Sequence, residues 1–127
     1  MKKLSLLIAF ALIAGAFHGN AQSLTNTAWR TYISSLNDSI TLHIGSDTSF
    51  VTMGTGDVVV RSVCHVNKDT LTMLDFDGQY MCTTGTGTYQ ITLKEDKLTM
   101  KMVTDPCSDR AGAIDGVAWA RVKMDKK

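Results

Sequence analysis

The stretch TYQITLKEDKLTMKM, residues 88–102, decides the fold class of this chain. Apolar side chains recur at every second position on both sides of a charged turn: Tyr89, Ile91, Leu93, Leu98, Met100 and Met102. A period of two is typical of a β-strand that buries one face, and a short turn between two such runs is typical of a hairpin. The stretch therefore predicts two antiparallel strands that share one inward face.

Outward from this hairpin, the chain beyond residue 21 repeats the pattern of short strands and turns. We expect strands at residues 29–33, 40–44, 49–53, 58–66, 70–76 and 117–123, with a short strand or strand edge at 79–82. Turn signals lie at 54–57 and 77–78, and one helical turn is expected around 110–114. This spacing predicts an all-β fold, a single antiparallel up-and-down β-barrel of about eight strands.

The first residues have the three-part pattern of a secretory signal peptide. Met1–Lys3 is positively charged, Leu4–Phe17 is almost entirely apolar, and Gly19–Ala21 offers small residues to a signal peptidase. The apolar run is shorter than the roughly 20 residues of a membrane span. We therefore expect residues 1–21 to be removed and residues 22–127 to form one domain without a membrane span. The expected destination is the periplasm or the medium of a bacterium.

Charge and histidine content narrow the choice of partners. Loss of Lys2 and Lys3 changes the formal net charge from +1 to −1, and no basic stripe with interleaved aromatic residues is present. Nucleic acid is therefore a poor partner candidate. His43 and His65 are too few for a typical zinc site, and His65 and Cys64 face opposite sides of a regular strand. We predict no metal and no cofactor.

No catalytic constellation can be assembled from the motifs of the chain. Asp75 and Asp77 flank a turn, where aspartates commonly stabilise the local backbone. Asp105, Asp109 and Arg110 cluster along the chain, where we expect charge-assisted hydrogen bonds to hold a loop. A nucleophile with its base and an orienting group is not recognisable, so we predict that the protein is not an enzyme.

Three cysteines in an exported chain leave at least one thiol unpaired. We predict a disulfide between Cys82 and Cys107, whose loop closure would contribute roughly 3 kcal/mol. A bridge between Cys64 and Cys82 would join neighbouring strands and stays open as an alternative. Counting by twos, one strand face is shared by Val58, Val60, Ser62, Cys64 and Val66. If that face is the core, Cys64 is a buried thiol.

Several short motifs resemble those of the lipocalins and their calycin relatives. They are Asn26-Thr27-Ala28-Trp29, Trp119-Ala120-Arg121, Cys82, Gly87-Thr88-Tyr89, Leu98, Asp105-Pro106-Cys107 and Arg110. Asn26 stands where the family usually has glycine. The resemblance covers residues 24–123 and is strongest to bacterial lipocalin-like domains that have a cysteine pair. It implies that Arg121 packs over the ring of Trp29, where a cation–π contact would contribute about 0.5–2 kcal/mol.

The barrel pattern, the export signal and the methionine-rich apolar faces together predict a function without catalysis, the binding of a small hydrophobic molecule in the barrel or at its mouth. Apolar and aromatic residues that could line such a pocket are Phe50, Met53, Met73, Phe76, Tyr89, Met100 and Met102. An alternative is an inhibitor of a secreted protease, with residues 22–25 entering the protease cleft. A further alternative is a structural component of the cell envelope.

Overall fold

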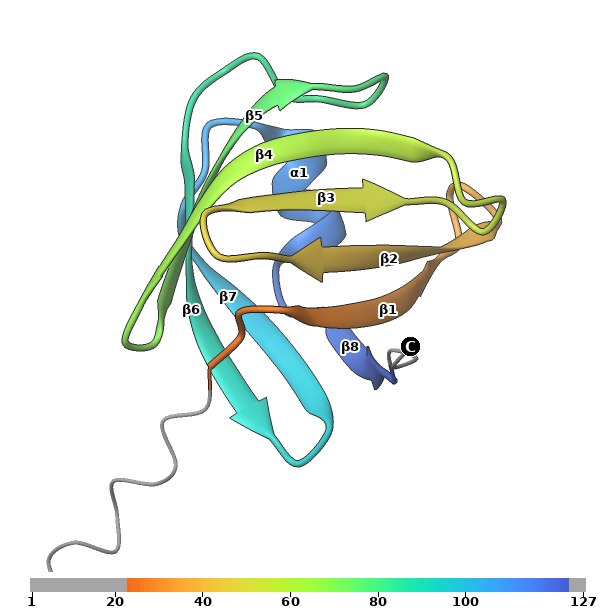
Figure 1. The fold of residues 1–127 in the computed structure, drawn as a ribbon. Coiled ribbons are helices and arrows are strands. Elements are labelled where there is room, and N and C mark those ends of the chain that lie inside the picture. Colours follow the sequence, from red (N-terminus) through yellow and green to blue (C-terminus); the bar gives the residue numbers. More distant parts are fainter. Residues whose placement is uncertain (1–22, 124–127) are drawn as a thin grey trace, which may run out of the picture.

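A computed structural model of the chain describes residues 23–123, so the predicted signal peptide lies outside the described part. Eight strands and one short helix follow one another (Figure 1): β1 (Thr27–Ile33), β2 (Asp38–Ile44), β3 (Thr48–Thr52), β4 (Val58–Asn67), β5 (Thr70–Asp77), β6 (Gly87–Lys94), β7 (Lys97–Thr104), α1 (Ser108–Ile114) and β8 (Ala118–Val122). Every strand pairs antiparallel with its sequence neighbour, and β1 pairs with β8. The predicted all-β, up-and-down barrel is confirmed.

The barrel is closed by a short ladder between its first and last strands. Ala28, Trp29 and Arg30 of β1 pair with Val122, Arg121 and Ala120 of β8, respectively. The guanidinium carbon of Arg121 lies 4.5 Å from the centroid of the Trp29 ring. The predicted packing of Arg121 over Trp29 is therefore confirmed, and it joins the two strands whose pairing completes the barrel.

The core occupies the barrel interior and is densest toward the end at which β1 begins. Its largest fully enclosed side chains include Trp29, Trp119, Tyr89, Leu71 and Leu98. They come from β1, β5, β6, β7 and β8, because alternate residues of each strand face the same interior. Leu24, just before β1, is 2 % exposed and belongs to the same cluster. One end of the barrel is thus filled by side chains.

A β-bulge changes the predicted inward face of β4. Val51 pairs with Val60, but Thr52 pairs with Val58, so the register shifts at Val59. Val59 is buried, whereas Val58 is 37 % exposed. Val58 therefore does not share the buried face of Ser62 and Cys64 that a regular alternation predicts, because an extra residue in one strand reverses the alternation beyond it. Beyond the bulge the expected face holds for Ser62 and Cys64, both buried, and Val66 at the strand end is 37 % exposed.

Residues 79–82 form no strand, contrary to the sequence prediction. The amide of Tyr80 donates to the carbonyl of Val59 at 3.0 Å, which anchors the start of the β5–β6 connection. Gly78 has a φ of +116°, and a Cβ there would lie 2.2 Å from the carbonyl oxygen of Val59. Only glycine therefore permits this close approach.

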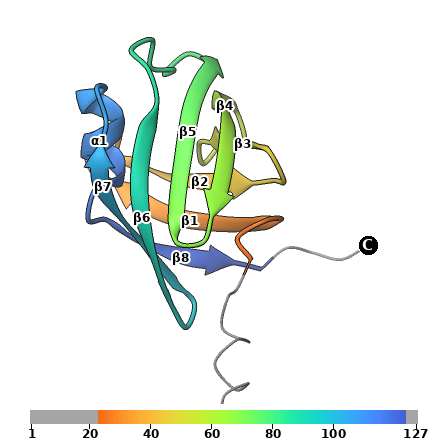
Figure 2. The same cartoon turned by 90° about the vertical axis from the view of Figure 1, so that its left-hand side faces the viewer.

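The barrel is splayed at its other end, where two strand pairs separate early. Strands β5 and β6 pair only over Thr70–Met73 with Gly87–Gln90, and β7 pairs with β8 only over Lys97–Thr99. Helix α1 lies at this end beside β6 and β7 (Figure 2), and it contains the helical turn predicted around residues 110–114. The amide of Gly116 donates to the carbonyl of Met100 at 2.9 Å and closes the gap beside β7.

Candidate binding cavity

A cavity of about 690 Å³ occupies the splayed end of the barrel. Its walls come from the inward faces of β1 to β5, the β5–β6 connection and helix α1. Apolar side chains make most of the wall, among them Ile33, Leu42, Val51, Met53, Met73 and Ile114. Leu36 and Tyr80 also line it and are 40 % and 48 % exposed, so they mark its mouth. A cavity of this size and character accommodates one small, largely apolar molecule.

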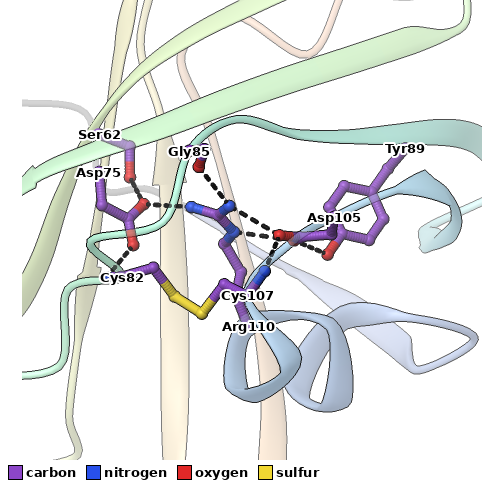
Figure 3. Close-up of a disulfide and its surroundings, with 8 residues drawn as sticks. All are labelled: Ser62, Asp75, Cys82, Gly85, Tyr89, Asp105, Cys107 and Arg110. Carbon is purple, nitrogen blue, oxygen red and sulfur yellow. Dashed lines mark hydrogen bonds and ion pairs between the residues drawn. A yellow bond between two sulfur atoms is a disulfide. The ribbon is translucent and has the colours of Figure 1, made fainter.

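Arg110 of α1 lines the cavity, and Figure 3 shows its contacts with Asp105, Gly85 and Asp75. Its Nε and Nη2 donate to the two carboxylate oxygens of Asp105 at 2.8 and 2.7 Å. Nη2 also donates to the carbonyl oxygen of Gly85 at 2.7 Å. Because the arginine side chain is only 6 % exposed, these charge-assisted bonds offset the cost of removing its charge from water.

Asp75 extends the same polar cluster to the barrel wall. Its Oδ1 lies 3.3 Å from Nη1 of Arg110 and accepts a hydrogen bond from the hydroxyl of Ser62 at 2.7 Å. Its other oxygen accepts from the amide of Cys82 at 2.8 Å. Arg110 and Asp75 therefore bridge the gap that opens where β5 separates from β6.

The ionisation of this cluster follows from its contacts. Burial opposes the charge of Asp105, but bonds from Arg110, Tyr89 and the amide of Cys107 outweigh it, so the pKa of this carboxyl lies below its usual value. The hydrogen bond to Asp105 raises the pKa of Arg110. Burial and the hydroxyl's own bond to Asp105 raise the pKa of Tyr89. The arginine is therefore cationic and Asp105 anionic over the whole physiological range.

Gly87 makes room for this arrangement at the start of β6. A Cβ at this position would lie 2.5 Å from Oδ2 of Asp105 and 3.1 Å from Nε of Arg110. Any side chain here would displace the carboxylate from the guanidinium. In the Gly87-Thr88-Tyr89 motif noted in the sequence, Gly87 leaves room for the carboxylate of Asp105. The hydroxyl of Tyr89 donates a hydrogen bond to the same carboxylate.

A disulfide reinforces the same corner of the molecule. Cys82 and Cys107 are bonded, with their Cα atoms 6.1 Å apart, and this confirms the predicted bridge. The bond ties the β5–β6 connection to the residue that precedes α1 (Figure 3). Cys64 is a buried free thiol, so the alternative bridge to Cys82 is wrong.

The residues predicted to contact a ligand are divided among three places. Met53 and Met73 line the cavity. Tyr89 and Met100, each 0 % exposed, lie in the packed core and not on the cavity wall. The remaining three, Phe50, Phe76 and Met102, do not line it either.

Local geometry explains why these three lie elsewhere. Phe50 stacks on His43, with ring centroids 4.3 Å apart and an interplanar angle of 7°. Phe76 is 52 % exposed near the end of β5, and Met102 is 38 % exposed near the end of β7, where pairing with β8 has already stopped. Of the seven predicted residues, Met53 and Met73 lie on the wall of this cavity.

The polar half of the cavity was only partly foreseen from the sequence. Asp105 and Arg110 were expected to hold a loop, and they do so, but their connection to Asp75 was missed. A usable signal exists, because Leu71, Met73 and Asp75 alternate along β5 and an inward carboxylate needs a buried partner. No cluster of three or more potential metal ligands occurs among residues 23–123.

No helix among residues 23–123 combines the length and apolar composition needed to cross a membrane. The eight-stranded closed antiparallel barrel is consistent with a calycin-like architecture. Comparison with protein-family models, with curated proteins and with solved structures finds no match for this chain.

Proposed function

We propose that this chain is an exported, lipocalin-like protein that binds a small, largely apolar molecule in the cavity at the splayed end of its barrel, without catalysis. The observation that carries the proposal is the cavity of about 690 Å³ with mostly apolar walls, to which the paired Arg110 and Asp75 contribute the buried charges. Apolar walls favour binding because they remove ligand surface from water, which contributes roughly 25 cal/mol per Å². The fixed corner around Arg110 keeps the cavity preformed, which lowers the cost of ordering on binding.

A neutral fluorescent probe such as Nile red tests this function directly. We expect saturable binding of one probe per chain to the purified protein. The variant Ala113→Phe places a larger side chain on the cavity wall and should weaken binding at least tenfold. The matched variant Ala111→Phe, on the same helix but away from the cavity wall, should keep the wild-type affinity.

The two variants also separate cavity filling from general damage to the helix. Equal thermal unfolding midpoints for both would show that any loss of binding comes from the filled cavity. Absence of saturable probe binding to the wild type, or equal losses in both variants, would overturn the proposed function.

Export is a second part of the proposal. It rests on the signal-like first 21 residues and is supported by the Cys82–Cys107 disulfide, because such bonds persist in oxidising compartments. Mass spectrometry of the protein expressed in a bacterial host should give a chain beginning at Gln22 in the periplasmic or medium fraction. An unprocessed chain retained in the cytosol would contradict this part.

The described residues provide no specific contact that favours a protease inhibitor or an envelope component. Leu24 lies in the segment expected to enter a protease cleft, but it is 2 % exposed within the core cluster. Burial of this residue ties the segment to the barrel. Both alternatives stay predictions from the sequence resemblance.

A further inference from the structure

Two buried side-chain donors have no hydrogen-bond partner among residues 23–123: Nε1 of Trp119 and Nη1 of Arg110. Both residues line the cavity, Trp119 from β8 and Arg110 from α1. In folded proteins the great majority of buried polar groups are paired, because an unpaired group keeps the full cost of its desolvation. Since both unpaired donors belong to residues of one cavity wall, a molecule bound in this cavity is the natural source of the missing acceptor.

The other tryptophan shows how this fold treats a buried indole away from the cavity. Nε1 of Trp29 donates to the hydroxyl of Thr27 at 2.8 Å, and Trp29 does not line the cavity. Trp119 is 2 % exposed and belongs to the core cluster, but its indole has no such hydroxyl partner within the described chain. Trp119 therefore lies where the packed core meets the cavity, with its donor unused.

Arg110 adds a second unused donor to the same wall. Its Nε and Nη2 are fully engaged with Asp105 and the carbonyl of Gly85. Nη1 lies 3.3 Å from the carboxylate of Asp75 as an ion pair, without a hydrogen bond. Because Nη1 carries two hydrogens, the pair with Asp75 leaves at least one of them available to a ligand. The wall thus asks for acceptor atoms rather than donors.

The charges on this wall favour a neutral acceptor over an anionic one. Arg110 is the one basic residue that lines the cavity in the described part of the chain, and it already faces the carboxylates of Asp105 and Asp75. Asp109 also lines the cavity. A ligand carboxylate would meet like charges without a second cation, and its desolvation costs more than that of a carbonyl group.

We propose that the ligand is a neutral, largely apolar carbonyl compound, such as a ketone, ester or amide, whose oxygen accepts a hydrogen bond from the indole of Trp119. This inference rests on the proposed function and names the class of ligand. The apolar part of the molecule fills the space beside Leu42, Val51 and Met73. A second acceptor oxygen on the ligand would find Nη1 of Arg110 on the same wall.

Three probes that differ only around one carbon atom test the inference: 2-octanone, 2-methyl-1-octene and octanoate. The alkene has the shape of the ketone, with a methylene group in place of the oxygen, and octanoate is the anionic counterpart. Displacement of Nile red at pH 7 gives three dissociation constants. We expect 2-octanone to bind at least fivefold more tightly than octanoate.

The variant Trp119→Phe assigns the acceptor preference to one donor. It removes the indole N–H and keeps an aromatic ring, so the ratio of ketone to alkene affinity should fall about fivefold, the factor that one net hydrogen bond contributes. Any loss of packing affects both probes alike and leaves this ratio unchanged. The matched variant Trp29→Phe removes an indole that is already paired with Thr27, and it should keep the wild-type ratio.

Nuclear magnetic resonance of the 15N-labelled wild type tests the same bond without a substitution. The two tryptophans give two indole N–H signals, and the signal of Trp29 is identified by its response to Thr27→Val, which removes its hydroxyl acceptor. Addition of 2-octanone should move the Trp119 signal downfield, as expected for a new hydrogen bond, whereas 2-methyl-1-octene should not. The Trp29 signal should respond to neither probe.

The outcomes separate this inference from the proposed function. Binding of the alkene and the ketone with the same affinity ratio in the wild type and in Trp119→Phe would overturn the carbonyl ligand while leaving the binding cavity standing. Equal shifts of the Trp119 signal with both probes, or tighter binding of octanoate than of 2-octanone, would overturn it as well. Failure of all three probes and of Nile red to bind would overturn both the cavity function and the inference.

Discussion

Arg110 shows at the residue scale how this molecule stabilises a charge in its interior. One guanidinium contacts Asp105, Gly85 and Asp75, which come from three separate segments of the chain. An isolated buried arginine would cost several kcal/mol, and removal of only one partner leaves that cost uncompensated. The cluster therefore specifies the arrangement of the splayed end, because other arrangements would leave charges unpaired.

The contact between Arg121 and Trp29 gives a first prediction at this scale. Arg121→Gln should lower the free energy of unfolding by about 1 kcal/mol, because it removes the charge over the indole ring while keeping most of the side-chain stem. Arg121 also pairs with Asp96 at 3.1 Å, but the Asp96 side chain is 82 % exposed. Asp96→Asn should therefore change stability by less than about 0.5 kcal/mol in the same urea titration. Equal effects of the two substitutions would contradict a cation–π contribution.

A second residue-scale prediction concerns the thiol of Cys64. Burial raises its pKa, and a hydrogen bond with Ser49 offsets only part of that effect. A thiol reagent that needs the thiolate, such as Ellman's reagent, should not label the native protein. In denaturant without reductant one thiol should react per chain, and after reduction three. Rapid labelling of the native protein would contradict the buried position.

At the scale of elements, helix α1 depends on its surroundings rather than on its own sequence. It has seven residues, too few for stability in isolation, and Cys107 at its N-cap makes no side-chain cap bond. The disulfide and the Arg110–Asp105 bonds anchor its first turns, and Ile114 packs into the core. The position of the helix therefore depends on the disulfide, on the Arg110–Asp105 bonds and on the packing of Ile114.

The carboxylate of Asp105, which lies just before helix α1, makes the stability of the folded chain depend on pH. Its pKa is lower in the folded chain than the ordinary value of about 3.9, so at falling pH the unfolded chain takes up the proton first. Stability from this group is complete above about pH 5 and is lost as pH falls toward the folded pKa. Asp105→Asn should lower stability at pH 7 by about 2 kcal/mol or more and flatten the decline between pH 5 and pH 2. An unchanged slope in urea titrations over this range would refute the assignment.

At the scale of the whole molecule, closure of the barrel and the opening of its cavity are linked. Pairing of β1 with β8 removes the outer edges of the sheet, while early separation of β5 from β6 and β7 from β8 leaves space at one end. The polar cluster and α1 occupy the edges of that space without filling it. The cavity is what remains between them.

Removal of the disulfide tests how much this end depends on its covalent tie. The double variant Cys82→Ser with Cys107→Ser should lower the free energy of unfolding by about 3 kcal/mol, the loop-closure value for a sequence separation of 25. The free energy of Nile red binding should fall by less than the free energy of unfolding does, because Arg110 still joins α1 to Asp105 and Asp75. Complete loss of probe binding in a variant that still unfolds cooperatively would contradict this division of roles.

Much of the architecture was determined by the sequence alone. Alternation with a period of two is a local property, so it identified the eight strands, the hairpin around residues 94–97 and the buried positions Tyr89, Leu98 and Met100. The cysteine pair and the contact of Arg121 with Trp29 were also predicted, because each carries a recognisable motif. By contrast, the sequence did not show that Phe50 and Phe76 lie away from this cavity, since apolar character does not say which face of a strand meets a cavity.

Only the tertiary structure decided where the cavity lies and which charges surround it. The bulge at Val59, the gap beside β5 and the ion pair of Asp75 with Arg110 depend on pairing between segments far apart in the chain. Local periodicity carries no information about such pairing, because a one-residue shift reverses the face of every residue beyond it.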